Sequence, residues 1–301
     1  MSSRSLNIAV TGATGWLGRS LLALKNRNEL EINFSIFGRR EEEFSLDTGH
    51  RFRTNFINIQ QMVSQQFDVF APFAFLTRDK ALGMSESQYV ESNKKLIEDA
   101  ALVIRGGNIG SVINLSSGVV TNMSEMQKMD ASYSVYADLK KFQEDTLFDA
   151  CSKVSTQFIN CRVFSLTGID MQDPLKYAVG DLINQAKKTR KIILRSKSPV
   201  TRRYMDSRNL LELILLRTNM KNHQFLESGG FKIDLESLSN IILSNFGGSR
   251  NSIEYAYQSL DAGNEYFSER KDFEDIADFH GIELTSMAKQ ITNVEQALNR
   301  A

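Results

Sequence analysis

The sequence predicts an α/β fold, a doubly wound parallel sheet with a smaller α/β lobe built from the C-terminal part of the chain. Three observations predict this fold. Short apolar runs alternate with segments in which apolar residues recur at helical spacing, a glycine-rich turn follows the first apolar run, and the regular alternation ends near residue 166. Strands that alternate with helices pair in parallel, because each helix carries the chain back to the edge from which it came.

The first strand, turn and helix lie in residues 7–22, NIAVTGATGWLGRSLL, where an apolar run precedes Gly12, Gly15 and Gly18. If a dinucleotide binds here, Gly12 permits the tight turn and Gly15 lets the backbone approach the pyrophosphate. Gly18 then lets the new helix pack closely against the sheet. Three glycines alone also suit a tight turn of any α/β protein, but the order strand, turn, helix favours a nucleotide site.

The second strand is expected at residues 32–37 and ends at Gly38, followed by Arg39 and Arg40. The end of this strand lies beside the adenosine ribose in a dinucleotide fold, where an arginine suits a 2′-phosphate and a carboxylate suits a free hydroxyl. The two arginines therefore favour NADP over NAD. Alternatively, they begin a charged surface loop together with the three glutamates at 41–43.

Two further elements follow a polar segment of weak periodicity at residues 44–66. Residues 67–77 read as a buried strand that runs into a loop, and a helix is expected from about 85 to 105, ended by two glycines. Asn93 stands on the otherwise apolar face of that helix. Such an asparagine either binds a neighbouring carbonyl or lines an interior polar site.

The predicted catalytic groups follow the next strand, at residues 111–115, whose carboxyl end carries Ser117. A helix from 134 to 147 then presents Tyr136 and Lys140 on one face, because they are four residues apart. A phenol is a poor base at neutral pH unless an ammonium stabilises its phenolate, and a serine hydroxyl can bind the reacting oxygen. Alone, a tyrosine and lysine at this spacing often mark a packed aromatic beside a surface lysine.

The second half of the chain is less regular. Helices are expected at 177–188, 209–217 and 235–245, and a short strand at 192–194. If the substrate carries a diphosphate, Arg202 is the best candidate to bind it, because a guanidinium contacts two phosphate oxygens at once. The alternative is an arginine paired with a carboxylate.

The composition argues against several classes of function. Lys and Arg number 36, as do Asp and Glu, so no net field attracts nucleic acid or an anionic membrane. Cys151 and Cys161 lack metal-ligand spacing and are expected to be free thiols, and the three histidines stand far apart, so no metal site is expected. Without a signal-peptide or membrane-spanning run, we expect a cytoplasmic protein.

The chain resembles the extended branch of the short-chain dehydrogenase/reductase superfamily, which contains nucleotide-sugar epimerases, dehydratases and ketoreductases. The resemblance is carried by TGATGWLG at 11–18, LSSG at 115–118 and YADLK at 136–140. Weaker similarity extends to CRVFSLTG at 161–168 and RRYMDSRNLLE at 202–212. Together these segments cover most of the chain.

The resemblance implies a Rossmann-type fold, a nicotinamide dinucleotide as cofactor, which the two arginines suggest is NADP with NAD less favoured, and a nucleoside-diphosphate sugar as substrate. The implied catalytic residues are Ser117, Tyr136 and Lys140. The implied cofactor-binding residues are Thr11, Gly12, Thr14, Gly15, Trp16, Leu17, Gly18, Arg39, Arg40, Ala74, Asn93 and Lys140. The implied substrate-binding residues are Ser117, Ser165 and Arg202.

Some positions depart from the family pattern. Residues 72–74 read Pro-Phe-Ala where His-x-Ala is frequent, and Ser165 replaces an asparagine that often contacts substrate. Gly118 and Val119 stand where the 4,6-dehydratases carry an acidic pair. Dehydration is therefore not expected.

Our leading hypothesis is a keto-sugar reductase, with an epimerase as the nearest alternative and a non-catalytic NADP-binding sensor or scaffold as the third. The cofactor domain is expected at 1–165, rejoined by about 205–228, and the substrate lobe at 166–204 and 229–301. The helices near 86–105 and 134–152 resemble the pair through which family members dimerise, so we expect a homodimer.

Overall fold

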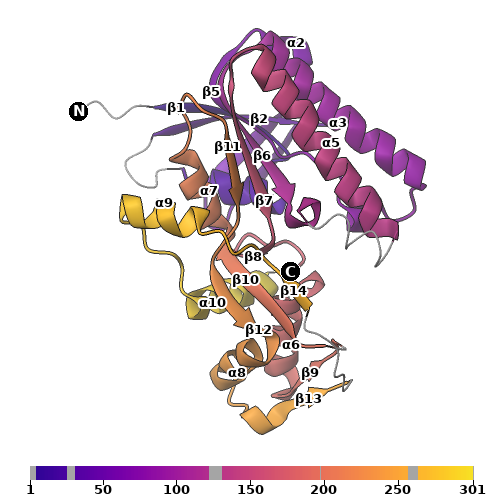
Figure 1. The fold of residues 1–301 in the computed structure, drawn as a ribbon, viewed down its shortest axis with the longest axis vertical. Coiled ribbons are helices and arrows are strands. Elements are labelled where there is room, and N and C mark those ends of the chain that lie inside the picture. The colour runs from indigo at the N-terminus through magenta and orange to yellow at the C-terminus, as the bar shows by residue number, and fades with distance from the viewer. Residues whose placement is uncertain (1–4, 26–30, 122–130, 197, 257–263, 301) are drawn as a thin grey trace. The chain divides into compact units, whose positions relative to one another are not determined.

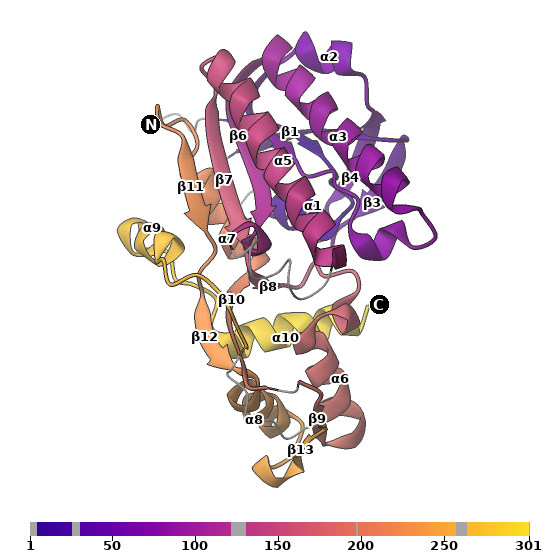
Figure 2. The same ribbon diagram turned by 45° about the vertical axis from the view of Figure 1, so that its right-hand side comes forward.

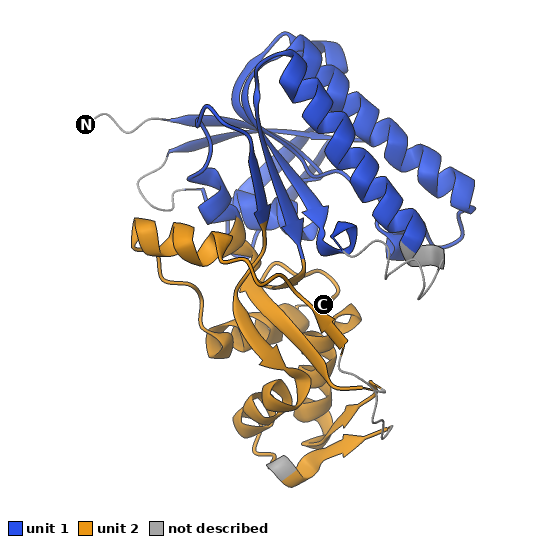
Figure 3. Cartoon of the chain, in the orientation of Figure 1, with its two compact units in different colours: residues 1–163, 211–226 blue, residues 164–210, 227–301 orange. Residues whose placement is uncertain are grey.

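The computed structural model describes residues 5–25, 31–121, 131–196, 198–256 and 264–300. The first four residues, part of the argument for a cytoplasmic location, lie outside this range. The chain forms two compact units, coloured separately in Figure 3. Unit 1 comprises Met1–Val163 and Leu211–Leu226, and unit 2 comprises Phe164–Leu210 and Glu227–Ala301. The assignment of a cofactor domain and a substrate lobe to these parts stays a prediction.

Unit 1 is built on one eight-stranded sheet with the order β11-β7-β6-β5-β1-β2-β4-β3. Its strands are β1 (Leu6–Thr11), β2 (Ile32–Gly38), β3 (Glu42–Ser45), β4 (Arg51–Phe56), β5 (Gln66–Pro72), β6 (Asn108–Ser117), β7 (Gln157–Val163) and β11 (Gln224–Glu227). β1 pairs in parallel with both β2 and β5, so the chain reverses its direction of progress across the sheet at β1. The predicted Rossmann-type parallel sheet is confirmed, and ligands of such sheets bind outside the carboxyl ends at this switch point.

Helices cover both faces of this sheet. They are α1 (Trp16–Leu22), α2 (Ile59–Val63), α3 (Glu86–Gly106) and α5 (Ala131–Lys153), with the short 3₁₀ turns η1 (Arg78–Ala81) and η2 (Gly118–Val120). Figures 1 and 2 show α2, α3 and α5 together on one face. Ala9 joins their buried core, whereas Ile8 and Val10 point to the opposite face because strand side chains alternate.

The predicted helix at 85–105 is confirmed as α3. Ser85 caps its start, accepting from the Gln88 backbone N–H at 3.2 Å while the Gln88 side chain accepts from the Ser85 N–H at 2.9 Å. This reciprocal pair satisfies two N–H groups that a helix start leaves unpaired. Gly107 ends the helix, as expected from the glycine pair.

The polar segment 44–66, for which no element was expected, contains most of a β3–β4 hairpin and α2. The Phe44 and Phe52 rings stack across the hairpin, with centroids 6.0 Å apart. Arg19 of α1 lies over the Phe44 ring and donates to the Ser45 carbonyl at 2.6 Å. The hairpin was missed because its stabilising contacts come from another element and its own apolar pattern is sparse.

Unit 2 has a small mixed sheet centred on β10 (Val200–Asp206), with β12 (Phe231–Asp234) antiparallel to it and β8 (Ser165–Thr167) and β14 (Asn264–Tyr266) parallel. β9 (Ile192–Leu194) pairs separately with β13 (Ile253–Tyr255). Its other elements are η3 (Pro174–Lys176), α6 (Ala178–Thr189), the start of α7 (Ser207–Leu215), α8 (Leu235–Asn245), η4 (Arg250–Ser252), α9 (Asp272–His280) and α10 (Met287–Leu298). β10, α9 and α10 were not predicted as elements. Among the described residues, no helix is both long and apolar enough to cross a membrane.

Candidate active site

The turn after β1 has the geometry that the glycine spacing predicts. Gly12 has φ +71°, and a Cβ there would lie 2.6 Å from both the Phe73 carbonyl carbon and the Ala74 nitrogen. Both the backbone angle and the space therefore require glycine at this position. A Cβ on Gly18 would lie 2.4 Å from the Gly12 carbonyl oxygen. Gly18 therefore lets the start of α1 lie close to the glycine turn, whereas the spacing suggested that it lets the helix lie close to the sheet.

The other residues of this loop surround that turn. Thr11, at the end of β1, accepts a hydrogen bond from the Ala74 N–H at 3.4 Å, which joins the ends of β1 and β5. Gly15 is the N-cap of α1 and offers no side chain to cap it. The cofactor contacts predicted for Thr11, Gly15 and Ala74, and for Thr14, Trp16 and Leu17, stay predictions.

The two arginines after β2 differ in their contacts. Both are exposed. Arg40 forms an ion pair with Glu42 at 2.8 Å, whereas Arg39 makes no hydrogen bond or ion pair with any residue that the structure describes. Arg39 is therefore the guanidinium that a 2′-phosphate can engage without breaking an existing pair.

The predicted catalytic groups lie on neighbouring elements of unit 1. Ser117 ends β6, is buried, and accepts from the Val119 N–H at 3.4 Å. Tyr136 is half-buried on α5, and Lys140 is one turn later on the same helix. α5 packs directly on β6, as the Lys140 hydrogen bond to a β6 carbonyl shows.

Lys140 is enclosed on all sides. Its Nζ donates to the Leu115 carbonyl at 3.0 Å and to Gln143 Oε1 at 2.9 Å, and it lies 3.9 Å from the centroid of the Phe75 ring. Burial lowers the pKa of Lys140 to about 7, although the negative charge of Glu144 opposes this shift. Near neutral pH the amine is thus poised between its charged and neutral forms.

Glu144 lies one turn beyond Lys140 and is itself buried. Arg162 of β7 contacts it with two parallel hydrogen bonds of 2.9 Å each. Burial raises the pKa of Glu144, but hydrogen bonds, first from Arg162, outweigh burial and hold that pKa below its usual value. An ionised carboxylate therefore lies near the Lys140 amine.

Asn93 is fully buried, and its amide holds the loop that follows β5. Its Oδ1 accepts from the Leu76 N–H at 2.8 Å, and its Nδ2 donates to the carbonyls of Leu76 and Tyr89 at 3.1 and 3.2 Å. The sequence left open whether Asn93 binds a neighbouring carbonyl or lines an interior polar site, and these contacts are of the first kind. The predicted contact of Asn93 with a cofactor stays a prediction.

Sequence reasoning missed Phe75. Its ring meets Tyr136 edge-on, with centroids 5.9 Å apart and planes at 87°, and its face covers Lys140. One signal was available, since the altered Pro-Phe-Ala segment directly precedes Phe75. Sequence spacing cannot show, however, that a loop side chain from β5 reaches a helix sixty residues further along the chain.

Of the three predicted substrate-binding residues, Ser117 lies in unit 1, whereas Ser165 and Arg202 lie in unit 2. Ser165 of β8 pairs in register with Tyr204 of β10. Arg202, also on β10, is half-buried, donates to the carbonyls of Thr201 and Asn264 at 2.8 and 2.9 Å, and lies over the Tyr266 ring. Within the described part of the chain, no carboxylate pairs with it.

The next residue, Arg203, has a structural role. It donates to the carbonyls of Gly230, Ser268 and Arg270 and forms an ion pair with Glu274 at 2.5 Å. Arg195 likewise pairs with Asp181 at 3.0 Å. Among the residues described, Arg203 and Arg195 therefore each have a carboxylate partner, whereas Arg202 has none.

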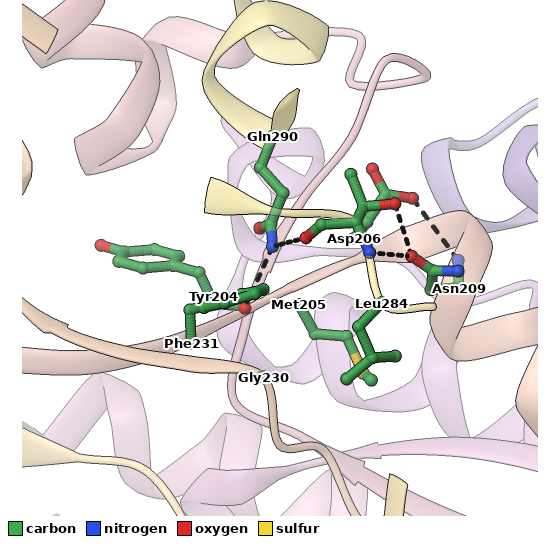
Figure 4. Close-up of a pocket in the computed structure, with 9 residues that line it drawn as sticks. Tyr204, Met205, Asp206, Asn209, Gly230, Phe231, Leu284 and Gln290 are labelled. Carbon is green, nitrogen blue, oxygen red and sulfur yellow. Dashed lines mark hydrogen bonds between the residues drawn. The ribbon is translucent and has the colours of Figure 1, made fainter. Parts of the chain in front are cut away.

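A small hollow in unit 2, drawn in Figure 4, is lined by apolar side chains, among them Met205 and Leu284, and by polar groups that bind one another. Gln290 donates to the carbonyls of Tyr204 and Thr285 at 3.4 and 2.9 Å, and Asn209 accepts from the Thr285 N–H at 2.8 Å. Asp206 accepts from the Arg208 N–H at 2.9 Å, and burial raises the pKa of this aspartate. The polar groups around the hollow thus form one connected hydrogen-bond network, which has the structural role of tying α10 to β10.

Within the described ranges, the thiols and the acidic and imidazole side chains give no sign of a metal site. Cys151 and Cys161 are buried thiols that form no disulfide, and burial raises the pKa of Cys151 to about 12. Among the described residues, no three His, Cys, Asp or Glu side chains are grouped so as to hold a metal ion. The candidate site of unit 1 therefore rests on the glycine turn, Ser117, Tyr136 and Lys140.

Comparison with solved structures supports the fold. UDP-N-acetylglucosamine 4-epimerase from Bacillus cereus is similar at 17% identity and a TM-score of 0.72, covering 98% of this chain and 97% of that one. ADP-L-glycero-D-manno-heptose-6-epimerase from Helicobacter pylori has 13% identity, a TM-score of 0.72, and coverage of 99% and 97%. MoeE5, solved in complex with UDP-glucose and NAD, has 14% identity, a TM-score of 0.70, and coverage of 97% and 99%.

At these identities the structures establish the fold alone, and a search of curated proteins finds no match. A family model, described as the NAD dependent epimerase/dehydratase family, matches residues 8–225. That range contains the glycine turn, the serine at the end of β6, and the tyrosine and lysine of α5. The chain therefore belongs to the NAD-dependent epimerase/dehydratase family, within the extended short-chain dehydrogenase/reductase superfamily.

Proposed function

We propose that the chain is an NAD(P)-dependent enzyme of the extended short-chain dehydrogenase/reductase type that epimerises a nucleoside-diphosphate sugar. Membership of the family supports the enzyme class, and Tyr136 and Lys140 on α5, with Ser117 at the end of β6, support the chemistry. The sequence favoured a keto-sugar reductase. The family description and two of the similar structures favour epimerisation, so net reduction becomes the alternative.

In this proposal, each catalytic side chain has one task. The chemistry that a bound nicotinamide cofactor supplies is reversible hydride transfer. Ser117 Oγ donates a hydrogen bond to the reacting sugar oxygen. Tyr136 Oη takes the proton of that hydroxyl and later returns it, and the positive charge of Lys140 stabilises its phenolate. Because an epimerase returns both hydride and proton, the cofactor is unchanged after each cycle.

The residues around the turn fit a dinucleotide. The backbone of Gly12 has no room for a side chain, so the turn stays compact at the switch point of the sheet. Arg39 supports NADP, because its guanidinium has no partner among the described residues and is exposed after β2. Arg39→Ala should weaken NADP binding at least about tenfold and NAD binding little. Isothermal titration with both cofactors tests this, and equal weakening of the two would remove the preference.

The substrate proposal rests on Arg202. Among the described residues its half-buried guanidinium donates to two carbonyl groups and lies over the Tyr266 ring, with no carboxylate partner, and burial lowers its pKa. A diphosphate would supply the negative charge that this position lacks. Ser165 pairs in register with Tyr204, two residues after Arg202 on β10, and is proposed as a weaker polar contact for the sugar.

The decisive experiment incubates the protein with NADP+ and a panel of nucleoside-diphosphate sugars, and separately with NADPH and a panel of nucleoside-diphosphate keto-sugars, and follows both products and cofactor. An epimerase forms a second sugar isomer in the first reaction, identified by NMR, without net reduction of NADP+. Stoichiometric loss of NADPH absorbance would instead establish the reductase. Tyr136→Phe should abolish either reaction while cofactor affinity is kept.

One observation favours the non-catalytic alternative, namely that the donors of Lys140 already engage protein groups. A sensor or scaffold would bind NADP without converting any sugar in the panel. Cofactor binding without turnover, unaffected by Tyr136→Phe, would establish this alternative.

We also propose a homodimer formed through α3 and α5, which lie side by side in Figures 1 and 2. Leu102 and Phe148 are the large exposed apolar side chains that the described parts of these helices offer. Ion pairs such as Lys95–Asp99 and Arg105–Asp149 lie on the same helices. Light scattering after size-exclusion chromatography tests the proposal, and a mass of about one chain would contradict it.

The cytoplasmic location also stays a prediction.

A further inference from the structure

The loop after β5 places one aromatic ring against both members of the tyrosine–lysine pair. The Phe75 centroid lies 5.9 Å from that of Tyr136 and 3.9 Å from Lys140 Nζ. Phe75 is half-buried and packs on the hydrophobic core of unit 1. Its position is therefore fixed by packing on one side and by the two polar groups on the other.

This arrangement accounts for every donor of the lysine. A lysine ammonium has three N–H groups. Here the Leu115 carbonyl and Gln143 Oε1 accept two of them, at 3.0 and 2.9 Å, and the face of the Phe75 ring covers the amine at cation–π distance. A further polar ligand can reach Lys140 only by displacing one of these three groups.

The ring is the group whose displacement costs least. The Leu115 carbonyl belongs to the β6 backbone and Gln143 is buried, so displacing either acceptor from Lys140 breaks a hydrogen bond in the interior of unit 1. Turning the ring away breaks no hydrogen bond, and its cost is limited to the contacts that this half-buried ring makes with the core and with the amine. The backbone beside it stays in place, because Asn93 binds both the N–H and the carbonyl of Leu76.

We propose that Phe75 is a positioning residue that gates Lys140, so that its ring must turn away before the lysine can bind a hydroxyl of the nicotinamide ribose. This inference rests on the proposed function, because that function places a nicotinamide nucleotide beside Lys140. Phe75 then sets the affinity for the nicotinamide half of the cofactor. The adenosine half, bound at the glycine turn and near Arg39, is recognised independently of the ring.

The test compares NADPH with 2′,5′-ADP, which has the adenosine half alone, by isothermal titration against the full chain. Phe75→Ala should tighten NADPH binding about tenfold, because the ring no longer competes for the ammonium. It should leave 2′,5′-ADP binding unchanged. A residue with only a structural role would weaken both ligands or neither.

Phe142→Ala is the matched control. Phe142 is also partly buried against the same core and has a lysine over its ring, with Lys94 Nζ 5.4 Å from the centroid. Its removal should leave both affinities unchanged. Phe75→Leu, which keeps apolar bulk without an aromatic face, is measured beside Phe75→Ala and should also bind NADPH more tightly.

The proposal is overturned if neither Phe75 variant binds NADPH more tightly than the wild type, or if 2′,5′-ADP gains equally. Tighter binding of NADPH without turnover of any nucleotide sugar would uphold the gate and remove the proposed enzymatic function. Turnover by the wild type with unchanged affinity in both variants would uphold the function and remove the gate.

Discussion

Lys140→Met should change how the stability of unit 1 depends on pH. Burial lowers the pKa of Lys140 from 10.5 to about 7. Between these pH values the unfolded chain binds a proton that the folded chain lacks, so the folded state loses stability as the pH falls from about 10 to 7. The full difference between the two pKa values corresponds to about 5 kcal/mol in the free energy of unfolding, and about 2 kcal/mol of this is lost between pH 9 and pH 7.

Urea unfolding at pH 7, 8 and 9 measures this effect, followed by the fluorescence of Trp16, the one tryptophan of the chain and a residue of unit 1. The free energy of unfolding of the wild type, relative to Lys140→Met, should rise by about 2 kcal/mol from pH 7 to pH 9. Methionine keeps the volume without the charge, and Glu144 keeps its Arg162 partner. Lys141→Met, at a partly exposed neighbouring position, is the control. A difference between wild type and Lys140→Met that stays constant across these pH values would refute the reasoning.

Three further substitutions test separate parts of the structure. Gly12→Ala should lower the free energy of unfolding by about 3 kcal/mol, because the new Cβ would sit on a left-handed backbone and overlap neighbouring backbone atoms. Gly49→Ala, also at positive φ but with open space around it, should lower it by only about 1 kcal/mol. Equal losses in urea unfolding would show that the overlap at Gly12 has no effect. Asn93→Ala should cost about 2–4 kcal/mol in the same assay, since it leaves buried backbone groups unpaired, and a loss near zero would show that water replaces the amide. Arg202→Ala should raise the Michaelis constant for a nucleotide sugar at least about tenfold with little change in turnover. Arg195→Ala, which removes an arginine already paired with Asp181, should leave the Michaelis constant unchanged. If Arg202→Ala had the same kinetic constants as the wild type, Arg202 would be excluded from the site.

The local sequence pattern was sufficient to predict the main features of unit 1. The apolar run, glycine turn and helix at residues 7–22 have the predicted order, and the tyrosine and lysine of α5 share a helical face because four residues make about one turn. Ser117 ends β6 as the strand pattern indicated. These predictions depend on contacts between residues near one another in sequence, which periodicity and glycine spacing describe directly.

Other features depended on contacts between distant segments. The β3–β4 hairpin is held partly by Arg19 of α1, and β10 carries two arginines whose roles diverge only through their partners. The sequence could not show that Arg40 is paired with Glu42 while Arg39 is not, since side-chain pairing on a turn depends on its geometry. The last two helices were missed because no neighbouring motif marked them.

The sequence by itself determined the fold class, the family and the elements that carry the serine, tyrosine and lysine, because alternating periodicity and short motifs specify local structure. Only the tertiary structure decided the environment of those groups. Lys140 is buried under Phe75, forms two hydrogen bonds and lies near the charge of Glu144, and these partners come from three separate parts of the chain. Desolvation and charge act through space, so no pattern along the chain reveals them.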